Sequence, residues 1–495
     1  MVGGAKGRRT LMGDDYPLRV IYAASECAPW VKTGGLADVT AALPPALAAL
    51  GVDVRVCLPA YRSVRQVVGD APVKATLLGA LVREAELPSG MKAYLVDAPW
   101  LFDRDGGPYQ DADGRDWTDN CARFGLFSHI AAVLASSESP LSWRPHIFHG
   151  HDWQAALAPA WLRLTQAVPA VSVMTVHNLA FQGLFPSGCV QAIHLPSEAY
   201  AIEGVEFYGQ VSFLKGGLHY ADALTTVSPT YAEEIQGAAY GCGLQGLLTH
   251  RKRDITGIVN GIDDKVWNPE TDPLIAAQYS AGRLFDKRPN KEALQRRFGL
   301  PRRSDVPVFG VVSRLTQQKG VDLIVEVAER LVASPAQLII LGCGERQLEA
   351  AVRDLVQRYP NAIAAHIGFD EKIAHEIEAG ADCFLMPSRF EPCGLNQMYS
   401  QRYGTPPIAR ATGGLVDTIY DGGETVIDKT TGFLFREATS AALWEAIARA
   451  LSWYRKPLVW EKIMRNAMRQ DFGWSQSAKR YKDLYERLLR LRRDG

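Results

Sequence analysis

A lysine stands directly before a glycine-rich turn near the start of the chain. Lys32 precedes Thr33-Gly34-Gly35, between a short β-rich run at residues 18–25 and a helical stretch at residues 36–50. The N–H groups at a helix N-terminus favour anions, and glycine lets a ligand approach the backbone closely. A lysine adds a point charge of the kind that phosphate sites use. The pattern fits a phosphate site, and the alternative is an ordinary tight turn beside a solvated lysine.

The same turn recurs in the second half of the chain. Residues 33–38 read TGGLAD, and residues 412–417 read TGGLVD. Both copies fall between an expected strand and an expected helix. Two such anion sites, one in each half, indicate a ligand that is held between two domains.

Two cations follow an expected strand of the second half. The strand ends near Val312, and the next loop, SRLTQQKG, carries Arg314 and Lys319. Ligands of open α/β sheets bind at the carboxyl ends of the strands, which is where this loop lies. The two charges can neutralise a diphosphate, although basic residues in a loop are often only surface groups.

One acidic residue occupies the same kind of position after another strand. Glu391 lies in RFEPCGL, which follows an expected strand at residues 383–387 and opens an expected helix that runs through Tyr403. A carboxylate there is available for chemistry at the sheet edge. Taken singly, a glutamate in a first helical turn is explained by the helix dipole, and Pro392 by the usual preference at helix starts.

Histidines end two expected strands of the first half. HGHDW at residues 149–153 and TVHN at residues 175–178 reach the same edge of the sheet. A zinc site is the obvious alternative, but no cysteine or acidic partner stands at ligand spacing. We therefore expect His149, His151 and His177 to be hydrogen-bonding groups, and we predict no metal site.

The elements that must position these loops form two series of alternating strands and helices. In the first half, strands are expected at residues 18–25, 52–58, 147–149, 171–176 and 223–227, and helices at 36–50 and 153–164. In the second half, strands are expected at residues 257–260, 308–313, 337–341, 362–367, 383–387 and 407–409, and helices at 321–331, 371–379 and 479–493. The pattern predicts two doubly wound domains with parallel sheets. A segment rich in Pro, Asp and Asn at residues 263–286 is the expected hinge.

Length and composition limit the classes of protein that fit. A chain of 495 residues exceeds the roughly 250–300 residues that one hydrophobic core supports, so at least two domains are expected. Lys plus Arg and Asp plus Glu both number 54, which argues against nucleic acid or an anionic membrane as partner and fits a neutral polysaccharide. No apolar run approaches the roughly 20 residues of a membrane span, and residues 1–15 lack the apolar core of a secretory signal. The eight cysteines are scattered, which predicts reduced thiols and a cytoplasmic location.

Taken in order, these motifs resemble those of the bacterial glycogen synthases and plant starch synthases, which are retaining glycosyltransferases of the GT-B architecture. The resemblance extends along nearly the whole chain. The motifs that carry it are KTGGL at 32–36, HDW at 151–153, TVHNL at 175–179, QVSFLKGGL at 210–218, TVSPTY at 226–231, NGID at 260–263, SRLTQQKG at 313–320 and SRFEPCGL at 388–395. Gly150, Gln154 and Asn396 depart from the family's common residues, and none of these changes removes a charged group.

The resemblance implies an α/β fold of the GT-B type, with two doubly wound Rossmann-like domains facing a central cleft. The implied parts are a disordered lead-in at residues 1–16, an acceptor-side domain at 17–256, a nucleotide-sugar donor domain at 257–473 and a C-terminal helix at 474–495 that crosses back to the first domain. It implies transfer of glucose from ADP-glucose to the non-reducing end of an α-1,4-glucan such as glycogen, with retention of configuration. It implies neither a metal nor pyridoxal phosphate, and neither a nucleic-acid nor a membrane partner.

Individual residues receive roles from the same resemblance. The implied catalytic residues are Glu391, His177, Arg314 and Lys319. Besides Arg314 and Lys319, the residues implied in donor binding are Lys32, Gly34, Gly35, Asp152, Asn260, Cys393, Gly394, Leu395, Thr412, Gly413 and Gly414. The residues implied in acceptor binding or in lining the cleft are Tyr109, Trp153 and Asn178.

The chemistry expected from these residues is electrostatic. Cations and helix N-termini would stabilise the departing diphosphate. Because only one credible carboxylate is found, front-face attack by the acceptor is preferred to a covalent intermediate. Two alternatives stay open, a glucan phosphorylase that carries pyridoxal phosphate and a glucan-binding scaffold without turnover. The choice between ADP-glucose and UDP-glucose also stays open.

Overall fold

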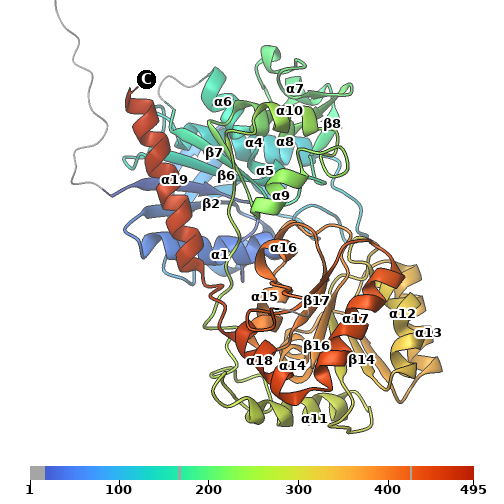
Figure 1. Ribbon diagram of the computed structural model, residues 1–495. Coiled ribbons are helices and arrows are strands. Elements are labelled where there is room, and N and C mark those ends of the chain that lie inside the picture. Colours follow the sequence, from blue (N-terminus) through green and yellow to red (C-terminus); the bar gives the residue numbers. More distant parts are fainter. Residues whose placement is uncertain (1–16, 166–168, 424–425, 495) are drawn as a thin grey trace, which may run out of the picture. The chain divides into compact units, whose positions relative to one another are not determined.

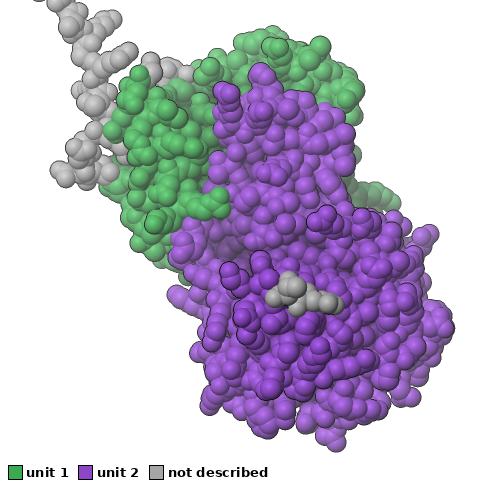
Figure 2. Space-filling view, viewed as in Figure 1, with its two compact units in different colours: residues 1–175, 181–224, 478–495 green, residues 176–180, 225–477 purple. Residues whose placement is uncertain are grey.

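The computed structural model describes residues 17–165, 169–423 and 426–494, and the chain divides into two compact units. Unit 1 contains residues up to 175, residues 181–224 and the chain from 478 onward, and unit 2 contains residues 176–180 and 225–477 (Figure 2). The expected lead-in at residues 1–16 lies outside the described residues. Each unit is built on a mostly parallel sheet with helices packed against it, which confirms the predicted class of fold.

The sheet of unit 1 is built around β1 (Arg19–Ala23), whose apolar residues are buried. β1 pairs in parallel with β2 (Asp53–Pro59) and β6 (Ile147–His151), and β6 pairs in parallel with β7 (Val171–Val176). The nine-stranded sheet has the order β12-β11-β7-β6-β1-β2-β5-β4-β3. Its remaining strands are β3 (Val73–Leu77), β4 (Ala80–Glu86), β5 (Lys92–Asp97), β11 (Ala223–Thr226) and β12 (Ile255–Gly257). Parallel pairing brings the loops after β1, β6 and β7 to one edge of the sheet.

Two features of this sheet differ from the prediction. β3 and β4 pair antiparallel, as do β4 and β5, so the sheet is mixed rather than parallel throughout. Leu78 and Gly79 have positive φ values of 51° and 81°, which suit the tight turn that joins β3 to β4. The strand expected at residues 257–260 is β12 at Ile255–Gly257. Its residues are grouped with unit 2, but it belongs to the nine-stranded sheet rather than to the second series.

Two helices were expected in the first half: the one at residues 36–50 is present, and the other is interrupted at a proline. The helix expected at residues 153–164 is divided into α5 (Asp152–Ala155) and α6 (Ala158–Leu164). Pro159 has no N–H to donate to residue 155, so it starts a new helix instead of continuing the old one. The other helices are α1 (Gly35–Ala48), α2 (Arg62–Val68), α3 (Pro99–Phe102), α4 (Asn120–Leu134), α7 (Cys189–Ala192), η1 (Ser197–Ala199) and α8 (Phe213–Tyr220). A small antiparallel sheet has the order β8 (Leu184–Pro186), β10 (Gln210–Ser212), β9 (Glu206–Phe207).

The sheet of unit 2 is parallel and is covered on both faces. Its order is β15 (Ile363–Ile367), β14 (Gln337–Gly342), β13 (Val308–Val312), β16 (Cys383–Met386), β17 (Pro407–Arg410), β18 (Phe433–Phe435). Along β14, Leu338 and Ile340 pack in one core cluster, and Ile339 and Leu341 pack in another. This alternation is the period of a strand, and it places helices on both sides of the sheet (Figure 1).

The helices of unit 2 begin with α9 (Pro229–Glu234), α10 (Gln245–His250), η2 (Leu284–Lys287), α11 (Arg288–Arg297), α12 (Val321–Ala333) and α13 (Arg346–Arg358). They continue with α14 (Glu371–Gly380), α15 (Asn396–Arg402), α16 (Gly414–Thr418), α17 (Ser440–Tyr454) and α18 (Pro457–Met468). α19 (Trp474–Asp494) starts in unit 2 and belongs to unit 1 from Ala478. Within the described ranges, every helix is too short or too polar to cross a bilayer.

Two loop regions differ from their expected form. α15 begins at Asn396, so Glu391 and Pro392 lie in the preceding loop rather than in the first turn of that helix. The expected hinge segment at residues 263–286 contributes Ile275 and Tyr279 to a core cluster of unit 2.

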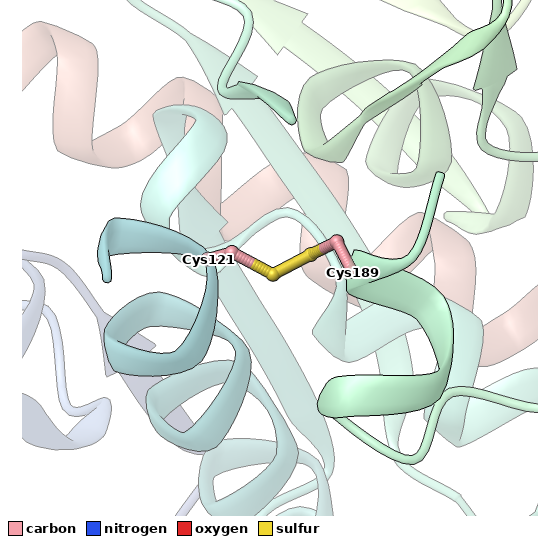
Figure 3. Close-up of a disulfide and its surroundings, with 2 residues drawn as sticks. All are labelled: Cys121 and Cys189. Carbon is pink, nitrogen blue, oxygen red and sulfur yellow. A yellow bond between two sulfur atoms is a disulfide. The ribbon is translucent and has the colours of Figure 1, made fainter. Parts of the chain in front are cut away.

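Cys121 and Cys189 form a disulfide, so the prediction that all eight cysteines are reduced is wrong for this pair. Cys121 lies in the first turn of α4 and Cys189 begins α7, with the two Cα atoms 6.3 Å apart (Figure 3). The pair is separated by 68 residues in sequence, and no spacing pattern indicates that these two helices meet. The other cysteines are thiols.

Reduction of this disulfide is expected to destabilise the protein, because the unfolded chain gains entropy when a loop of this length opens. The loss is at most about 4 kcal/mol in the free energy of unfolding. Thermal unfolding with and without dithiothreitol measures it. Cys121→Ser should match the reduced parent and show no further response to the reductant. Equal unfolding midpoints for the oxidised and reduced parent would contradict the expectation.

Candidate active site

The glycine turn after β1 is held by a buried glutamate. Glu26, which is 3% exposed, accepts hydrogen bonds from the N–H groups of Thr33 (2.6 Å) and Gly34 (3.1 Å) and from the Thr33 hydroxyl (2.5 Å). The Tyr109 hydroxyl donates to the same carboxylate at 2.5 Å. The N–H groups that were predicted to bind a ligand anion therefore bind an internal carboxylate. A phosphate at this position would have to replace Glu26.

Lys32 lies at the surface beside this turn, one residue before it. Its ammonium group is 2.7 Å from Oδ1 of Asp38, and the two side chains are 45% and 35% exposed. An exposed pair of this kind contributes little to stability. Lys32 can therefore exchange Asp38 for a ligand at small cost, while Gly35 begins α1.

The first residue of α5, directly after β6, has a strained backbone. Asp152 has a φ of 53°. Positive φ values are uncommon for residues other than glycine, and residues that adopt them are often found at functional positions. The next residue, Trp153, packs at a ring distance of 4.8 Å from Phe124 and of 6.3 Å from Tyr109. The fold thus brings Tyr109, Asp152 and Trp153 together, and all three were predicted as site residues.

The histidines of β6 are buried among hydrogen-bonding side chains. Nε2 of His149 lies 2.6 Å from the Thr175 hydroxyl, and Nδ1 lies 2.7 Å from the Tyr485 hydroxyl of α19. His151 stacks on Tyr22 with ring centroids 3.9 Å apart. Burial raises the pKa of both tyrosines above the ordinary value. His149 therefore joins β6, β7 and α19 through its two ring nitrogens.

In unit 2, the loops after β13 and β16 are fixed to each other. Gly320 has a φ of 68°, and a Cβ atom at this position would lie 2.1 Å from the carbonyl oxygen of Pro387. Only glycine permits so close an approach. Arg389 donates two hydrogen bonds of 2.7 Å to Asp322 at the start of α12. These contacts fix the separation between the loop that carries Lys319 and the loop that carries Glu391.

Lys319 and Glu391 form an ion pair across these two loops. Nζ of Lys319 is 2.5 Å from Oε2 of Glu391, and the Ser388 hydroxyl donates to the same oxygen at 3.0 Å. Glu391 is 6% exposed, and the Lys319 side chain is 19% exposed. A carboxylate that is this buried needs a compensating charge, and Lys319 supplies it. The pair places one negative and one positive group at the carboxyl ends of neighbouring parallel strands.

The second Thr-Gly-Gly turn packs against the backbone of Glu391. The Gly414 N–H donates to the Glu391 carbonyl at 3.1 Å. Gly413 has a φ of 45°, and a Cβ atom there would lie 2.0 Å from the same carbonyl oxygen. A Cβ atom on Gly414 would lie 2.2 Å from the carbonyl oxygen of Cys393. The two glycines therefore let the turn support the Glu391 loop from behind.

Cys393 and Asn260 lie against each other beside this turn. Burial raises the pKa of the Cys393 thiol to about 12, and a hydrogen bond from the backbone of Asn260 opposes that rise. Oδ1 of Asn260 is buried and has no hydrogen-bond partner among the described residues. A ligand hydroxyl is one group that would satisfy such an atom. Gly394, with a φ of 72°, and Leu395 complete the loop before α15.

The remaining predicted residues of unit 2 lie in loops. Arg314 is exposed, and its guanidinium lies 3.4 Å from Oε1 of Gln318. The Asn178 side chain accepts a hydrogen bond of 3.0 Å from the Ala180 N–H. The structure therefore brings Lys319 and Glu391 into contact, and leaves Arg314 at the surface of the same loop as Lys319.

The pKa of His177 is expected to make the stability of the protein depend on pH. Burial lowers this pKa from 6.5 to about 4. Between these values the unfolded chain binds more protons than the folded protein, so the stabilisation by neutral His177 is complete above pH 6.5 and is lost as the pH falls toward 4. The loss is at most about 3 kcal/mol.

Denaturant unfolding from about pH 4 to about pH 8 measures this loss. His177→Asn should flatten the slope below pH 6.5. His129→Asn is the matched comparison, because burial also lowers the pKa of His129 to about 4. Equal slopes for the parent and His177→Asn would rule out the His177 contribution.

Two residues of the site were missed at the level of sequence. Glu26 lies three residues after the end of β1, and its only signal is that it is the first acidic residue after that strand. Ser388 precedes Glu391 by three residues, and nothing in the spacing marks it as a hydrogen-bond donor to that carboxylate. No group of three or more His, Cys, Asp or Glu side chains is arranged to hold a metal ion in the part of the chain that the structure describes.

The chain is similar to known families and solved structures along most of its length. Residues 19–250 match the family described as starch synthase catalytic domain, and residues 293–467 match glycosyl transferases group 1. The solved structure of the catalytic domain of starch synthase IV from Arabidopsis thaliana, bound to ADP and acarbose, is similar with a TM-score of 0.84 and 32% identity, covering 96% of this chain and 99% of that one. Sucrose-phosphate synthase from Thermosynechococcus elongatus shares the fold, with a TM-score of 0.60, 19% identity and coverage of 96% of this chain and 100% of that one.

Curated relatives match along nearly the whole chain. The glycogen synthase of Aromatoleum aromaticum is 54% identical over 479 residues, which cover 94% of this chain and 96% of that relative. The glycogen synthase of Dechloromonas aromatica is 51% identical over 483 residues, which cover 96% of this chain and 99% of that relative. Identity of this extent, together with the match to the starch synthase catalytic domain, shows that the chain belongs to the bacterial glycogen synthase family of glucosyltransferases.

Proposed function

We propose that the protein transfers glucose from ADP-glucose to the non-reducing end of an α-1,4-glucan, with retention of the anomeric configuration. The observation that carries this proposal is the buried Glu391 held by Lys319 at the carboxyl edge of the unit 2 sheet. Membership of the glycogen synthase family supports the reaction. The similar starch synthase IV structure is bound to ADP and acarbose, which supports an ADP-linked donor and a glucan acceptor.

Arg314 and Lys319, the cations of the loop after β13, stabilise the departing ADP. Cleavage of the bond between the anomeric carbon and the diphosphate leaves negative charge on ADP, and charges that are oriented in advance stabilise it most effectively. Glu391 already neutralises much of the Lys319 charge. Arg314 is exposed, and within the described residues its side-chain partner is the uncharged Gln318. Arg314 therefore supplies most of the net positive charge, and Lys319 serves both Glu391 and the diphosphate.

Glu391 stabilises the transferred glucose in the transition state. Its hydrogen bonds from Lys319 and Ser388 both use Oε2, so Oε1 is left to stabilise the positive charge that develops at the anomeric carbon. A double displacement uses two carboxylates close together. Glu391 is the one carboxylate that the motifs assign to the sugar, which favours front-face attack, in which the acceptor oxygen bonds to the anomeric carbon on the face that the diphosphate leaves. The acceptor proton then passes to the leaving phosphate.

The test is a transfer assay with the purified protein. Glycogen is incubated with ADP-glucose, UDP-glucose or GDP-glucose, and nucleotide release is measured beside incorporation of labelled glucose. We expect release with ADP-glucose to exceed that with the other donors, and the added glucose to be removable by an α-1,4-specific hydrolase. Glucan binding without nucleotide release from any donor would overturn the proposal in favour of a scaffold.

We also propose that the reaction needs no metal ion, because Arg314, Lys319 and Lys32 supply the positive charge that a divalent cation would provide. Saturating EDTA is expected to leave at least about half of the initial rate, since loss of an essential metal would remove several kcal/mol of charge stabilisation. The assay is repeated in EDTA with magnesium or manganese added back. A thousand-fold loss that magnesium or manganese restores would contradict this mechanism.

A further inference from the structure

In unit 2, the short helices α9 and α16 are joined by two carboxylates, each of which accepts hydrogen bonds from the start of the other helix. Asp417 of α16 accepts hydrogen bonds from three donors at the start of α9. These are the Ser228 hydroxyl at 2.5 Å, the Thr230 hydroxyl at 2.7 Å and the Thr230 N–H at 3.0 Å. The first N–H groups of a helix have no partner within the helix, so Asp417 satisfies the start of α9 from outside.

The reverse contact comes from the last residue of α9. Glu234 accepts hydrogen bonds through Oε1 from the Thr412 hydroxyl at 2.9 Å and from the Gly413 N–H at 3.0 Å, directly before α16. Each of the two helices therefore carries the carboxylate that satisfies the start of the other. We call this pair of contacts, made by Glu234 and Asp417, the carboxylate clamp.

The clamp holds the turn that supports Glu391. The Gly413 N–H donates to Glu234, and the next N–H, that of Gly414, donates to the Glu391 carbonyl. One turn thus connects the Glu234 carboxylate to the backbone of Glu391 through two adjacent amides. No room exists for the turn to move toward Glu391, because a Cβ atom on Gly413 would already lie 2.0 Å from the Glu391 carbonyl oxygen. Movement away from Glu391 is what Glu234 opposes.

The other oxygen of Glu234 argues against a role in stability alone. Oε2 is buried and has no hydrogen-bond partner among the described residues. A buried carboxylate oxygen without a partner costs free energy, so this position is not optimised for stability. The Thr-Gly-Gly turn of unit 1 is held in the same way, by Glu26 on the N–H groups of Thr33 and Gly34.

We infer that Glu234 is a positioning residue for the transfer reaction, which acts by holding the Thr412–Gly414 turn against the backbone of Glu391. This inference rests on the proposed function, because its kinetic consequence is expressed through Glu391. The sequence predicted this Thr412–Gly414 turn as an anion site. In the present inference the turn is a support, because the Gly413 N–H is already bonded to the Glu234 carboxylate. Binding of the substrates makes no direct use of Glu234.

Kinetics of Glu234 variants test the inference. Glu234→Ala is expected to lower kcat about 10- to 50-fold, with the KM for ADP-glucose and for glycogen within about threefold of the parent. Glu234→Gln keeps the accepting oxygen and is expected to restore kcat to within about threefold of the parent. Glu233→Ala changes the exposed neighbour on the same helix and should leave both constants unchanged. An unchanged kcat in Glu234→Ala would overturn the inference.

A double variant shows whether Glu234 acts through Glu391. In a Glu391→Gln background, Glu234→Ala is expected to lower the residual kcat less than about threefold, because the residue that it positions is already disabled. If the two losses multiply, Glu234 acts independently and the inference fails.

Hydrogen exchange tests the clamp without reference to activity. The amides of Gly413 and Gly414 are expected to exchange at least about tenfold faster in Glu234→Ala than in the parent or in Glu233→Ala, because their turn is released. Unchanged exchange would overturn the inference even where kcat falls. If the parent shows no transfer with any nucleotide-glucose, but these amides still exchange faster in Glu234→Ala than in the parent, the clamp stands and the proposed function is contradicted instead.

Discussion

Replacement of Glu391 by alanine is expected to lower kcat at least about 100-fold, which corresponds to about 2.7 kcal/mol of transition-state stabilisation. The carboxylate is buried and is held by Lys319 and Ser388, so its charge is oriented before the reaction begins. Alanine removes that charge and also leaves the Lys319 ammonium without its partner. The measurement is kcat with ADP-glucose and glycogen, beside the midpoint of thermal unfolding.

Two variants separate charge from shape. Glu391→Gln keeps the size of the side chain and can still accept from Lys319 and Ser388, so an equally low kcat would assign the effect to the negative charge. Glu378→Gln is the control for a buried glutamate, since Glu378 is also buried in unit 2, where burial raises its pKa well above the ordinary value. It should leave kcat unchanged. A normal kcat in Glu391→Ala would remove this residue from the mechanism.

The parts of the fold that depend on local periodicity could be predicted from the sequence. The strands β7 and β13 and the helices α12 and α14 lie within two residues of their expected bounds, because buried parallel strands are apolar runs and the helices between them are amphipathic. Once these elements are known, the edge rule for open sheets places the loops of Lys319 and Glu391 together. Their ion pair follows from topology rather than from a contact that the sequence displays.

Partners that are distant in sequence could not be predicted. Glu234, which holds the second of the two Thr-Gly-Gly turns, lies 178 residues before Thr412. Glu26 lies only seven residues before Thr33 of the first turn, but it was missed as well. The prediction treated the N–H groups of these turns as vacant because a local motif shows donors and not the acceptors that reach them. The Cys121–Cys189 disulfide was missed for the same reason, since the packing of α4 on α7 is a tertiary property.

Lys319→Ala is expected to lower kcat about 100-fold or more, and to destabilise the protein as well. The side chain balances a carboxylate that is only 6% exposed, so its removal leaves Glu391 buried without a compensating charge. Breaking a buried pair from one side costs about 3 kcal/mol in the free energy of unfolding. The measurements are kcat and denaturant unfolding of the same preparation.

The double variant Lys319→Ala with Glu391→Gln distinguishes the two roles of the lysine. Removal of the buried negative charge should return most of the lost stability, because no unpaired carboxylate remains, whereas kcat should stay at the level of the single variants.

Arg314→Ala is the matched control for the loss of a cation. Arg314 is exposed and has no salt bridge within the described ranges, so we expect a comparable fall in kcat with an unfolding free energy within about 0.5 kcal/mol of the parent. If Lys319→Ala were as stable as Arg314→Ala, or if the double variant were less stable than Lys319→Ala, the lysine would not be what compensates the buried charge of Glu391. If kcat were normal in Lys319→Ala and only KM changed, Lys319 would bind substrate without stabilising the transition state.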